Sequence, residues 1–297
     1  MRILIFSDNY PPETNAPATR TSEHAALWAA AGHKVTVVTC APNYPAGRIY
    51  PGYRNVPISV AWQGGVRVVR VWTYMAPNAG FFRRIMDFVS FAMGAAVIGT
   101  LLPFDVLVAT SPQFFTAVAG GAVGLFRRKP WVFEVRDLWP ESIKAVGAMG
   151  SGRAFRILEA VELFLYQRAA RVVVVTRQFR ANLISRRVRS DKVFVVPNGA
   201  NTKLFRPISA TRAVSCQGEI TVGYVGTHGM AHGLDFVLGV ARKEAEIRFF
   251  FVGEGAEKER LVRLTGNLHN VEFLDPVPKT EIPNILSSLD YALVNLK

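Results

Sequence analysis

The chain has few cysteines and no long membrane-spanning run. Its two cysteines, Cys40 and Cys216, lie far apart in the sequence without metal-ligand spacing, so the pattern predicts neither a disulfide framework nor a zinc site. The N-terminus enters an apolar strand at Arg2 without the layout of a signal peptide, which favours a reducing cytoplasm. The uncharged run from Phe88 to Leu102 is shorter than the roughly 20 residues that span a bilayer.

Acidic residues are also scarce. The 297 residues include 35 Lys and Arg but only 22 Asp and Glu, a net charge of +13. This excess indicates an anionic partner: nucleic acid, a phosphorylated ligand or an anionic membrane surface. Nucleic acid is not expected, because no aromatic-basic array or helix-turn-helix pattern accompanies the charge. Arg83 and Arg84 precede the uncharged run and Pro103 ends it, so it predicts either an interfacial helix or an ordinary buried helix.

Short β-branched runs alternate with helical or loop segments, which predicts a doubly wound α/β fold. Runs such as 172–175, all valine, indicate strands covered on both faces, as in parallel sheets. From Phe155 onward apolar residues recur at helical spacing, with Glu159 and Glu162 on the expected solvent face. The expected strands are Arg2–Phe6, Lys34–Thr39, Val66–Val71, Asp105–Ala109, Trp131–Val135, Arg171–Thr176, Lys192–Val196, Ile220–Val225, Ile247–Val252, Val271–Leu274 and Tyr291–Val294.

The composition changes after Phe205: the periodic spacing of apolar residues is lost, and Pro, Ser and Thr become frequent. We therefore expect a first domain over residues 1–205, a linker over 206–218 and a second α/β domain over 219–297. The chain ends at Lys297, directly after its last expected strand, so the second domain is expected to be incomplete.

The loop after the first strand is a candidate binding site. It contains no glycine between Ser7 and Pro12, so the dinucleotide-binding fingerprint is missing. We expect this loop to extend to about Arg20 before the next helix begins. Open α/β sheets bind ligands at the carboxyl ends of their strands, which makes Glu13, Asn15 and Arg20 candidate ligand contacts. The alternative is a solvated loop whose polar residues serve solubility.

Two glycine turns follow strands of the second domain, at Gly226 and at Gly253. Backbone N–H groups left free at such turns, together with a helix N-terminus, predict a phosphate-binding site. The alternatives are tight turns that need no ligand and exposed loop histidines. The candidate donor contacts are Gly226, Thr227, His228, Gly229, His232, Gly253, Glu254 and Gly255.

Five features lie in a fixed order along the chain: the segment 8–13, Val196-Pro197-Asn198-Gly199 with Phe205, the turn at Gly226, the segment 252–255, and 270–273 through Asp290. In this order they resemble one family, the retaining glycosyltransferases of family GT4, which have the GT-B fold. Two further segments, 135–142 and 228–234, are most similar to the subgroup that builds bacterial surface polysaccharides, typified by L-fucosamine transferases of O-antigen synthesis. The resemblance covers essentially all 297 residues.

The resemblance implies two Rossmann-like doubly wound domains, the first holding the acceptor and the second a nucleotide-sugar. The implied donor is a UDP-N-acetyl sugar and the implied acceptor a polyprenyl-diphosphate-linked glycan of lipopolysaccharide, O-antigen or capsule biosynthesis. The implied location is peripheral, on the cytoplasmic face of the bacterial plasma membrane. No metal or other cofactor is expected. The open alternatives are a GT-B-fold UDP-sugar epimerase and a non-catalytic remnant that binds only acceptor or membrane.

The resemblance also implies roles for single residues. Asp137 would orient the acceptor hydroxyl, the alternative being an N-cap of the turn through Pro140. Asn198 would face the acceptor, or form a generic turn with Gly199. Many relatives clamp the diphosphate with an Arg and a Lys where this chain has Thr227 and His232. Relatives also carry two glutamates beyond the last strand, so this chain by itself is expected to have little or no activity.

Overall fold

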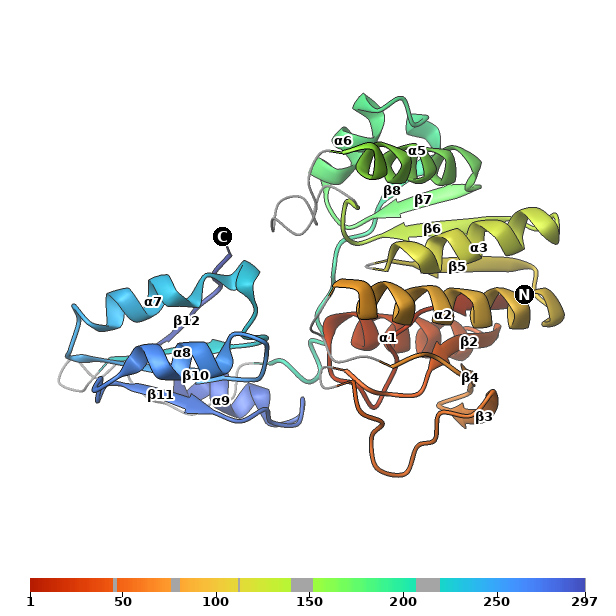
Figure 1. Ribbon diagram of the computed structural model, residues 1–297. Helices are drawn as coiled ribbons and strands as arrows, with labels where there is room; N and C mark the ends of the chain where they lie inside the picture. Colours follow the sequence, from red (N-terminus) through yellow and green to blue (C-terminus); the bar gives the residue numbers. More distant parts are fainter. Residues whose placement is uncertain (45–46, 76–80, 112, 140–151, 207–219, 297) are drawn as a thin grey trace. The chain divides into compact units, whose positions relative to one another are not determined.

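The computed structural model describes residues 1–44, 47–75, 81–111, 113–139, 152–206 and 220–296. They divide into two compact units, Met1–Asn198 and Gly199–Lys297 (Figure 1). Each unit is built on a sheet with helices packed against it, so the predicted α/β class with two Rossmann-like units is confirmed. The linker expected at 206–218 lies outside the described residues except for Arg206 and stays a prediction.

The described part of the first unit forms an eight-stranded sheet in the order β3-β4-β2-β1-β5-β6-β7-β8. Neighbouring strands run parallel except β3, which is antiparallel to β4. The strands are β1 (Arg2–Phe6), β2 (Lys34–Cys40), β3 (Ile58–Gln63), β4 (Val66–Val71), β5 (Val106–Thr110), β6 (Trp131–Val135), β7 (Arg171–Val174) and β8 (Val193–Val195).

Helices cover both faces of this sheet because its strands bury alternate residues on opposite sides. Ile3 and Ile5 of β1 belong to the apolar cluster under α1, whereas Leu4 and Phe6 belong to the larger cluster under α2 and α3. The helices are α1 (Ala16–Ala30), α2 (Phe81–Leu101), α3 (Phe114–Phe126), α5 (Arg153–Arg168), α6 (Arg177–Ser185) and the 3₁₀ turn η1 (Ser190–Lys192).

The first helix begins earlier than the sequence predicts. The side chain of Asn15 accepts a hydrogen bond of 2.9 Å from the N–H of Ala18, which caps α1 at Ala16. Pro17 in the first turn suits this start, because a residue at that position needs no intrahelical N–H bond. Arg20 therefore lies inside α1 and not in a long loop, which corrects the sequence expectation.

The described part of the second unit is a parallel sheet in the order β11-β10-β9-β12. Its core joins β9 and β10 to α7 and α8 through Tyr224, Leu238, Phe251 and Leu261. Gly223 of β9 leaves room for Leu289, since a Cβ there would lie 2.2 Å from a Leu289 methyl group. The elements are β9 (Ile220–Val225), η2 (Met230–His232), α7 (Leu234–Ala241), β10 (Ile247–Val252), α8 (Lys258–Thr265), β11 (Val271–Leu274), α9 (Ile282–Ser288) and β12 (Tyr291–Ala292).

Candidate functional site

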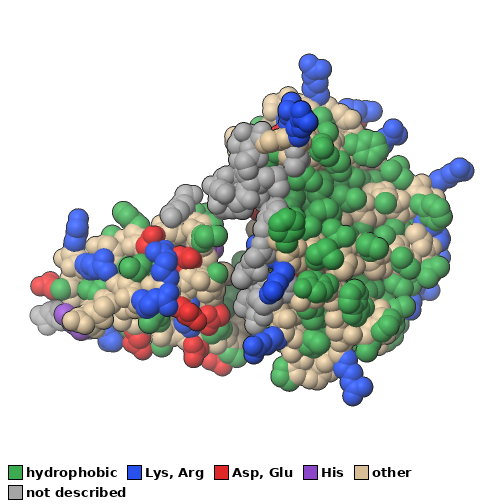
Figure 2. All heavy atoms as spheres, viewed as in Figure 1, with side chains coloured by type: hydrophobic (Ala, Val, Ile, Leu, Met, Phe, Trp, Pro, Cys, Tyr) green, Lys and Arg blue, Asp and Glu red, His purple; other side chains and the backbone are tan. Residues whose placement is uncertain are grey.

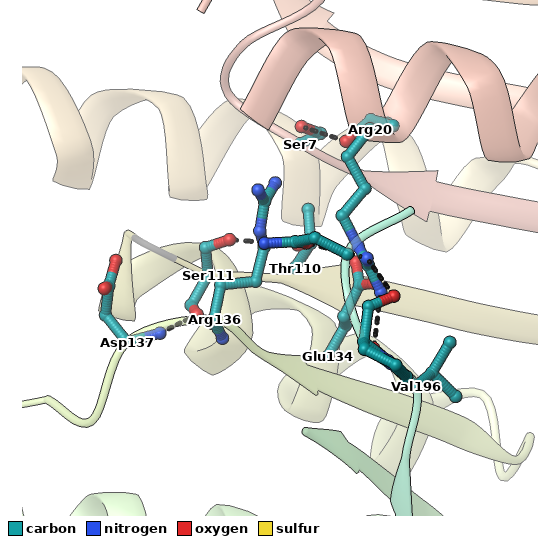
Figure 3. A network of polar contacts seen from close by, with 11 residues as sticks. Ser7, Arg20, Thr110, Ser111, Glu134, Arg136, Asp137 and Val196 are labelled. Atoms are coloured by element: carbon teal, nitrogen blue, oxygen red, sulfur yellow. Dashed lines mark hydrogen bonds and ion pairs between the residues drawn. The ribbon is translucent and has the colours of Figure 1, made fainter. Parts of the chain in front are cut away.

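A polar network lies at the carboxyl edge of the first sheet, where β5 and β6 end next to each other (Figure 3). Ser111 follows β5, and its N–H donates to the carbonyl of Glu134 at 2.9 Å. The Ser111 hydroxyl accepts from the N–H of Arg136 at 2.7 Å and from that of Asp137 at 3.4 Å. These bonds fix the backbone that presents Arg136 and Asp137.

Arg20 is the centre of this network. Its guanidinium donates to Glu134 Oε1 at 2.8 Å, to Asn198 Oδ1 at 2.8 Å and to the Val196 carbonyl at 3.2 Å. A fourth bond of 3.3 Å reaches the carbonyl of Pro197. Arg20 and Glu134 are each only 7% exposed. The ion pair thus joins α1, the end of β6 and the last residues of the first unit.

Asp137 is exposed beside this network. Desolvation raises the pKa of its carboxyl above the usual value, and the charge of Arg136 opposes that rise. An exposed carboxylate held by a fixed backbone can accept a hydrogen bond from a hydroxyl ligand. The turn through Pro140, invoked as an alternative role for Asp137, lies outside the described residues. Its assignment as the acceptor-orienting residue stays a prediction.

The other residues predicted in the first loop have structural partners. Asn15 caps α1 and also donates to Asn9 Oδ1 at 2.6 Å. Glu13 is buried, and its Oε1 accepts from the N–H groups of Asn43 at 2.8 Å and Tyr44 at 2.9 Å. Burial raises the pKa of the Glu13 carboxyl, and these N–H donors partly offset the rise. Glu13 therefore ties this loop to the loop after β2 and is not exposed to a ligand.

Sequence reasoning missed His24, near the network, and the burial of the Asp8 carboxyl in the first loop. His24 lies one turn beyond Arg20 on α1, and burial lowers the pKa of its imidazole while the charge of Glu134 opposes this. Asp8 follows β1; burial, reinforced by Asp87, raises the pKa of its carboxyl well above the ordinary value. Helical spacing from Arg20 could have indicated His24. No sequence signal marks the burial of Asp8.

In the second unit the two glycine turns pack directly against each other. The N–H of Gly226 donates to the Val252 carbonyl at 2.9 Å, and that of His228 to the Glu254 carbonyl at 2.9 Å. The N–H of Gly253 donates to the Leu274 carbonyl at 3.2 Å. The amides of Gly226 and Gly253 are therefore already used, which corrects the expectation that they are free for phosphate.

Close backbone approach explains the glycines of the second turn. A Cβ at Gly253, whose φ is +142°, would lie 2.0 Å from the carbonyl oxygen of Gly226. A Cβ at Gly255 would lie 2.4 Å from the carbonyl oxygen of His228. A Cβ at Gly229 would meet nothing closer than 3.5 Å. Packing alone thus requires glycine at 253 and 255.

His228 is a buried aromatic side chain. It is 0% exposed, and its ring packs edge-on against Phe251 and Phe273 at centroid distances of 6.5 and 5.6 Å. Within the described residues neither ring nitrogen has a hydrogen-bond partner. Burial, with a smaller contribution from Lys258, lowers its pKa to about 4. His228 is therefore not the exposed loop histidine considered as an alternative, and its contact with the donor stays a prediction.

The remaining donor-side candidates lie around these turns. His232 ends η2, and its carbonyl accepts from Asn295 Nδ2 at 2.7 Å. Glu254 carries a carboxylate 3.3 Å from Lys258 Nζ, and Asp275 lies 2.9 Å from the same nitrogen. Burial lowers the pKa of Lys258, but its hydrogen bonds to Asp275 and Glu254 outweigh this and raise it. Lys258 was missed, although its i,i+4 spacing from Glu254 is visible in the sequence.

Thr227 and Glu254 are the two donor-side candidates whose backbone N–H donates to no acceptor among the described residues; Thr227 lies at the first glycine turn. It lies between Gly226 and His228, and in the part of the chain that the structure describes its N–H donates to no acceptor. Its carbonyl accepts from the Tyr224 hydroxyl at 2.9 Å, which holds the turn in place. Across the same residues no group of three His, Cys, Asp or Glu side chains could hold a metal ion. The expectation that no metal is needed stays a prediction.

The chain is similar to proteins of known family. Residues 15–199 match the glycosyl transferase 4-like domain. Over 99% of its length the chain is 22% identical to WcaI of Escherichia coli (strain K12), named as a colanic acid biosynthesis glycosyl transferase, and it covers 76% of that protein.

Two solved structures share the fold. Sucrose-phosphate synthase of Thermosynechococcus elongatus matches with a TM-score of 0.72 and 16% identity, over 98% of this chain and 74% of that one. HepE of Anabaena, in complex with UDP-glucose, matches with a TM-score of 0.66 and 14% identity, over 98% of this chain and 73% of HepE. At these identities the likeness is one of fold.

Removing either partner of the Arg20–Glu134 pair should destabilise the first unit. Arg20→Leu leaves a buried carboxylate unpaired, so we expect the free energy of unfolding to fall by about 3 kcal/mol. Urea unfolding followed by tryptophan fluorescence reports this unit, because all five tryptophans lie within residues 1–198. Arg189→Ala, which breaks an exposed ion pair with Asp191, is the control and should leave the free energy of unfolding almost unchanged. Equal losses would contradict the central role of Arg20.

Adding a methyl group at the second turn should disrupt the second unit. We expect Gly253→Ala to lower its stability by about 3 kcal/mol, because the new Cβ overlaps backbone and the φ is strained. Gly229→Ala has room and should change it by less than about 1 kcal/mol. Hydrogen exchange of the β9 and β10 amides measures both. Similar exchange in the two variants would show that the turns are not in contact.

His228 should make the second unit acid-sensitive. Its pKa is about 4 in the folded state and ~6.5 when unfolded. The unfolded chain therefore binds the extra proton, and this contribution to stability is lost as pH falls from about 6.5 to about 4, by at most about 3 kcal/mol. The free energy of opening, obtained from exchange of the β9 and β10 amides after correction for the intrinsic rate, should depend less on pH in His228→Leu. In His269→Gln its pH dependence should be unchanged. Parallel profiles for the two variants would refute the assignment.

Proposed function

Because the chain belongs to the glycosyl transferase 4-like family, we propose that it transfers a sugar from a UDP-N-acetyl sugar to a lipid-linked glycan, with retention of the anomeric configuration. The proposed product is a bacterial surface polysaccharide, such as lipopolysaccharide with its O-antigen or a capsule. The observation that carries the proposal is the family match over residues 15–199, which includes Arg20, Glu134 and Asn198. This match favours sugar transfer over the epimerase alternative.

We assign the acceptor to the first unit. Asp137 is exposed at the carboxyl edge of the sheet, where open α/β folds bind their ligands. In this proposal its carboxylate accepts a hydrogen bond from the acceptor hydroxyl. The Arg20 guanidinium fixes Glu134 near the end of β6 together with the segment 196–198. Arg20 and Glu134 are positioning residues, because each is buried and bonded to protein groups.

We assign the UDP moiety to the second unit. The fold relative HepE is described with UDP-glucose, which supports this choice of donor. Sugar transfer leaves negative charge on the departing diphosphate, and this charge needs hydrogen-bond donors. The Thr227 N–H is such a donor, held at the turn between β9 and α7. Since the amides of Gly226 and Gly253 are used, the glycines act by bringing the two turns together.

A proline substitution tests the Thr227 amide directly. Thr227→Pro removes the N–H, whereas Thr227→Ala removes only the side chain. If the amide binds the diphosphate, calorimetry should show UDP affinity lowered by about tenfold or more in Thr227→Pro and changed by less than about threefold in Thr227→Ala. Circular dichroism confirms that each variant is folded. Identical affinities would exclude this amide, and wild-type protein that binds no UDP would favour the non-catalytic remnant that binds only acceptor or membrane.

Turnover separates the two enzyme classes. A transferase consumes a UDP-N-acetyl sugar only when a polyprenyl-diphosphate-linked glycan is present, whereas an epimerase converts it without an acceptor. Product analysis of both reactions by mass spectrometry and NMR decides between them. Turnover without an acceptor would overturn the proposed function.

A further inference from the structure

We propose that the outward face of α2, together with the end of α3, binds the headgroup interface of an anionic membrane. The proposal deepens the function above, because a lipid-linked acceptor lies in such a membrane. It rests on three observations about the first unit. α2 carries an exposed apolar stripe, β3 exposes apolar side chains on the sheet face that α2 covers, and the positive charge of the chain is concentrated in this unit.

The stripe runs the length of α2. Its side chains recur at positions that share one helical face, and all are more than half exposed, from Phe82 at 81% to Leu101 at 74%. Phe126, the last residue of α3, is 76% exposed. The two helix ends are joined, because the Arg127 guanidinium donates to the Thr100 carbonyl. The stripe consists of Phe82, Met86, Met93, Val97 and Leu101.

The opposite face of α2 anchors it to the protein. Phe91, Ala95 and Ile98 are buried in the core under the sheet. By length and composition alone, 82–101 could cross a membrane. Because its inner face completes the core of the first unit, we place the helix flat on a membrane surface, with its apolar stripe facing the lipid.

Strand β3 adds exposed apolar surface on the same side of the sheet. Val60 pairs with Val69, and residues directly opposite each other in antiparallel strands point to the same face. Val69 belongs to the core cluster that includes the inner face of α2. Val60 and Trp62 therefore face the α2 side, where they are 51% and 70% exposed.

The charge of the chain is concentrated in this unit. Residues 1–198 hold 24 of the 35 Lys and Arg and 11 of the 22 Asp and Glu, so the whole excess of 13 lies there. Residues 199–297 hold 11 of each sign. Basic side chains near an anionic surface strengthen membrane binding by electrostatic attraction.

Basic side chains also flank the stripe itself. Arg83 and Arg84 are exposed at the start of α2, and Arg128 and Lys129 directly after α3. The one acidic residue of α2, Asp87, is buried, and α3 contains no charged residue. Figure 2 shows hydrophobic side chains spread over the first unit with Lys and Arg around the margin. Apolar side chains rimmed by cations, without exposed carboxylates, complement an anionic lipid interface.

Vesicle flotation with purified protein tests this surface. We expect binding to vesicles of phosphatidylglycerol and phosphatidylcholine, and much weaker binding to phosphatidylcholine alone. The double variant Met93→Ser, Val97→Ser should lower the partition coefficient by about tenfold, and Arg83→Ser, Arg84→Ser should do so by a similar factor. Leu27→Ser is the matched control, because Leu27 is 67% exposed on α1, over the other face of the sheet.

The outcomes separate this proposal from the proposed function. Circular dichroism and UDP calorimetry should be unchanged in the stripe and arginine variants, because those residues lie in the first unit. Wild-type protein that stays off the anionic vesicles, or a stripe variant that binds as Leu27→Ser does, would overturn the membrane surface. Analytical ultracentrifugation that shows the stripe variant dissociating a dimer would assign the face to a second copy instead. Vesicle binding without UDP binding would overturn the proposed function alone.

Discussion

The first unit depends on the buried ion pair between Arg20 and Glu134. Taking both charges out of water is costly, and the guanidinium offsets this by donating to four acceptors, including the carbonyls of Val196 and Pro197. One side chain therefore ties α1 to β6 and to the last residues before the second unit. The backbone that presents the exposed Asp137 is held by the Ser111 hydroxyl, which accepts from the N–H groups of Arg136 and Asp137.

A different constraint governs the second unit. Two turns meet so closely that only glycine fits at positions 253 and 255. Their amides and carbonyls bond to neighbouring strands, and the contact encloses His228 among aromatic rings. The same packing leaves the Thr227 N–H without a protein acceptor in the described residues. The glycines thus act indirectly: they shape the turn whose amide we propose as the donor site.

The two units differ in charge as well as in packing. The first carries the entire positive excess, an exposed apolar stripe and the exposed carboxylate of Asp137. The second is neutral by count. This division fits an enzyme whose acceptor is attached to a membrane and whose donor is soluble. It also explains how a protein with a pI near 10.1 can have an anionic partner other than nucleic acid.

The order of the elements and most strand positions follow from the sequence alone, because β-branched runs and helical spacing depend on local pattern. Only the tertiary structure placed Glu162 in the interior, where it pairs with Arg186 at 2.7 Å. Only the tertiary structure shows that β3 joins the sheet, that His228 is enclosed, and that the amides of Gly226 and Gly253 donate to carbonyl groups. Each of these outcomes depends on which segments meet in space, and local periodicity carries no information about partners distant in the chain.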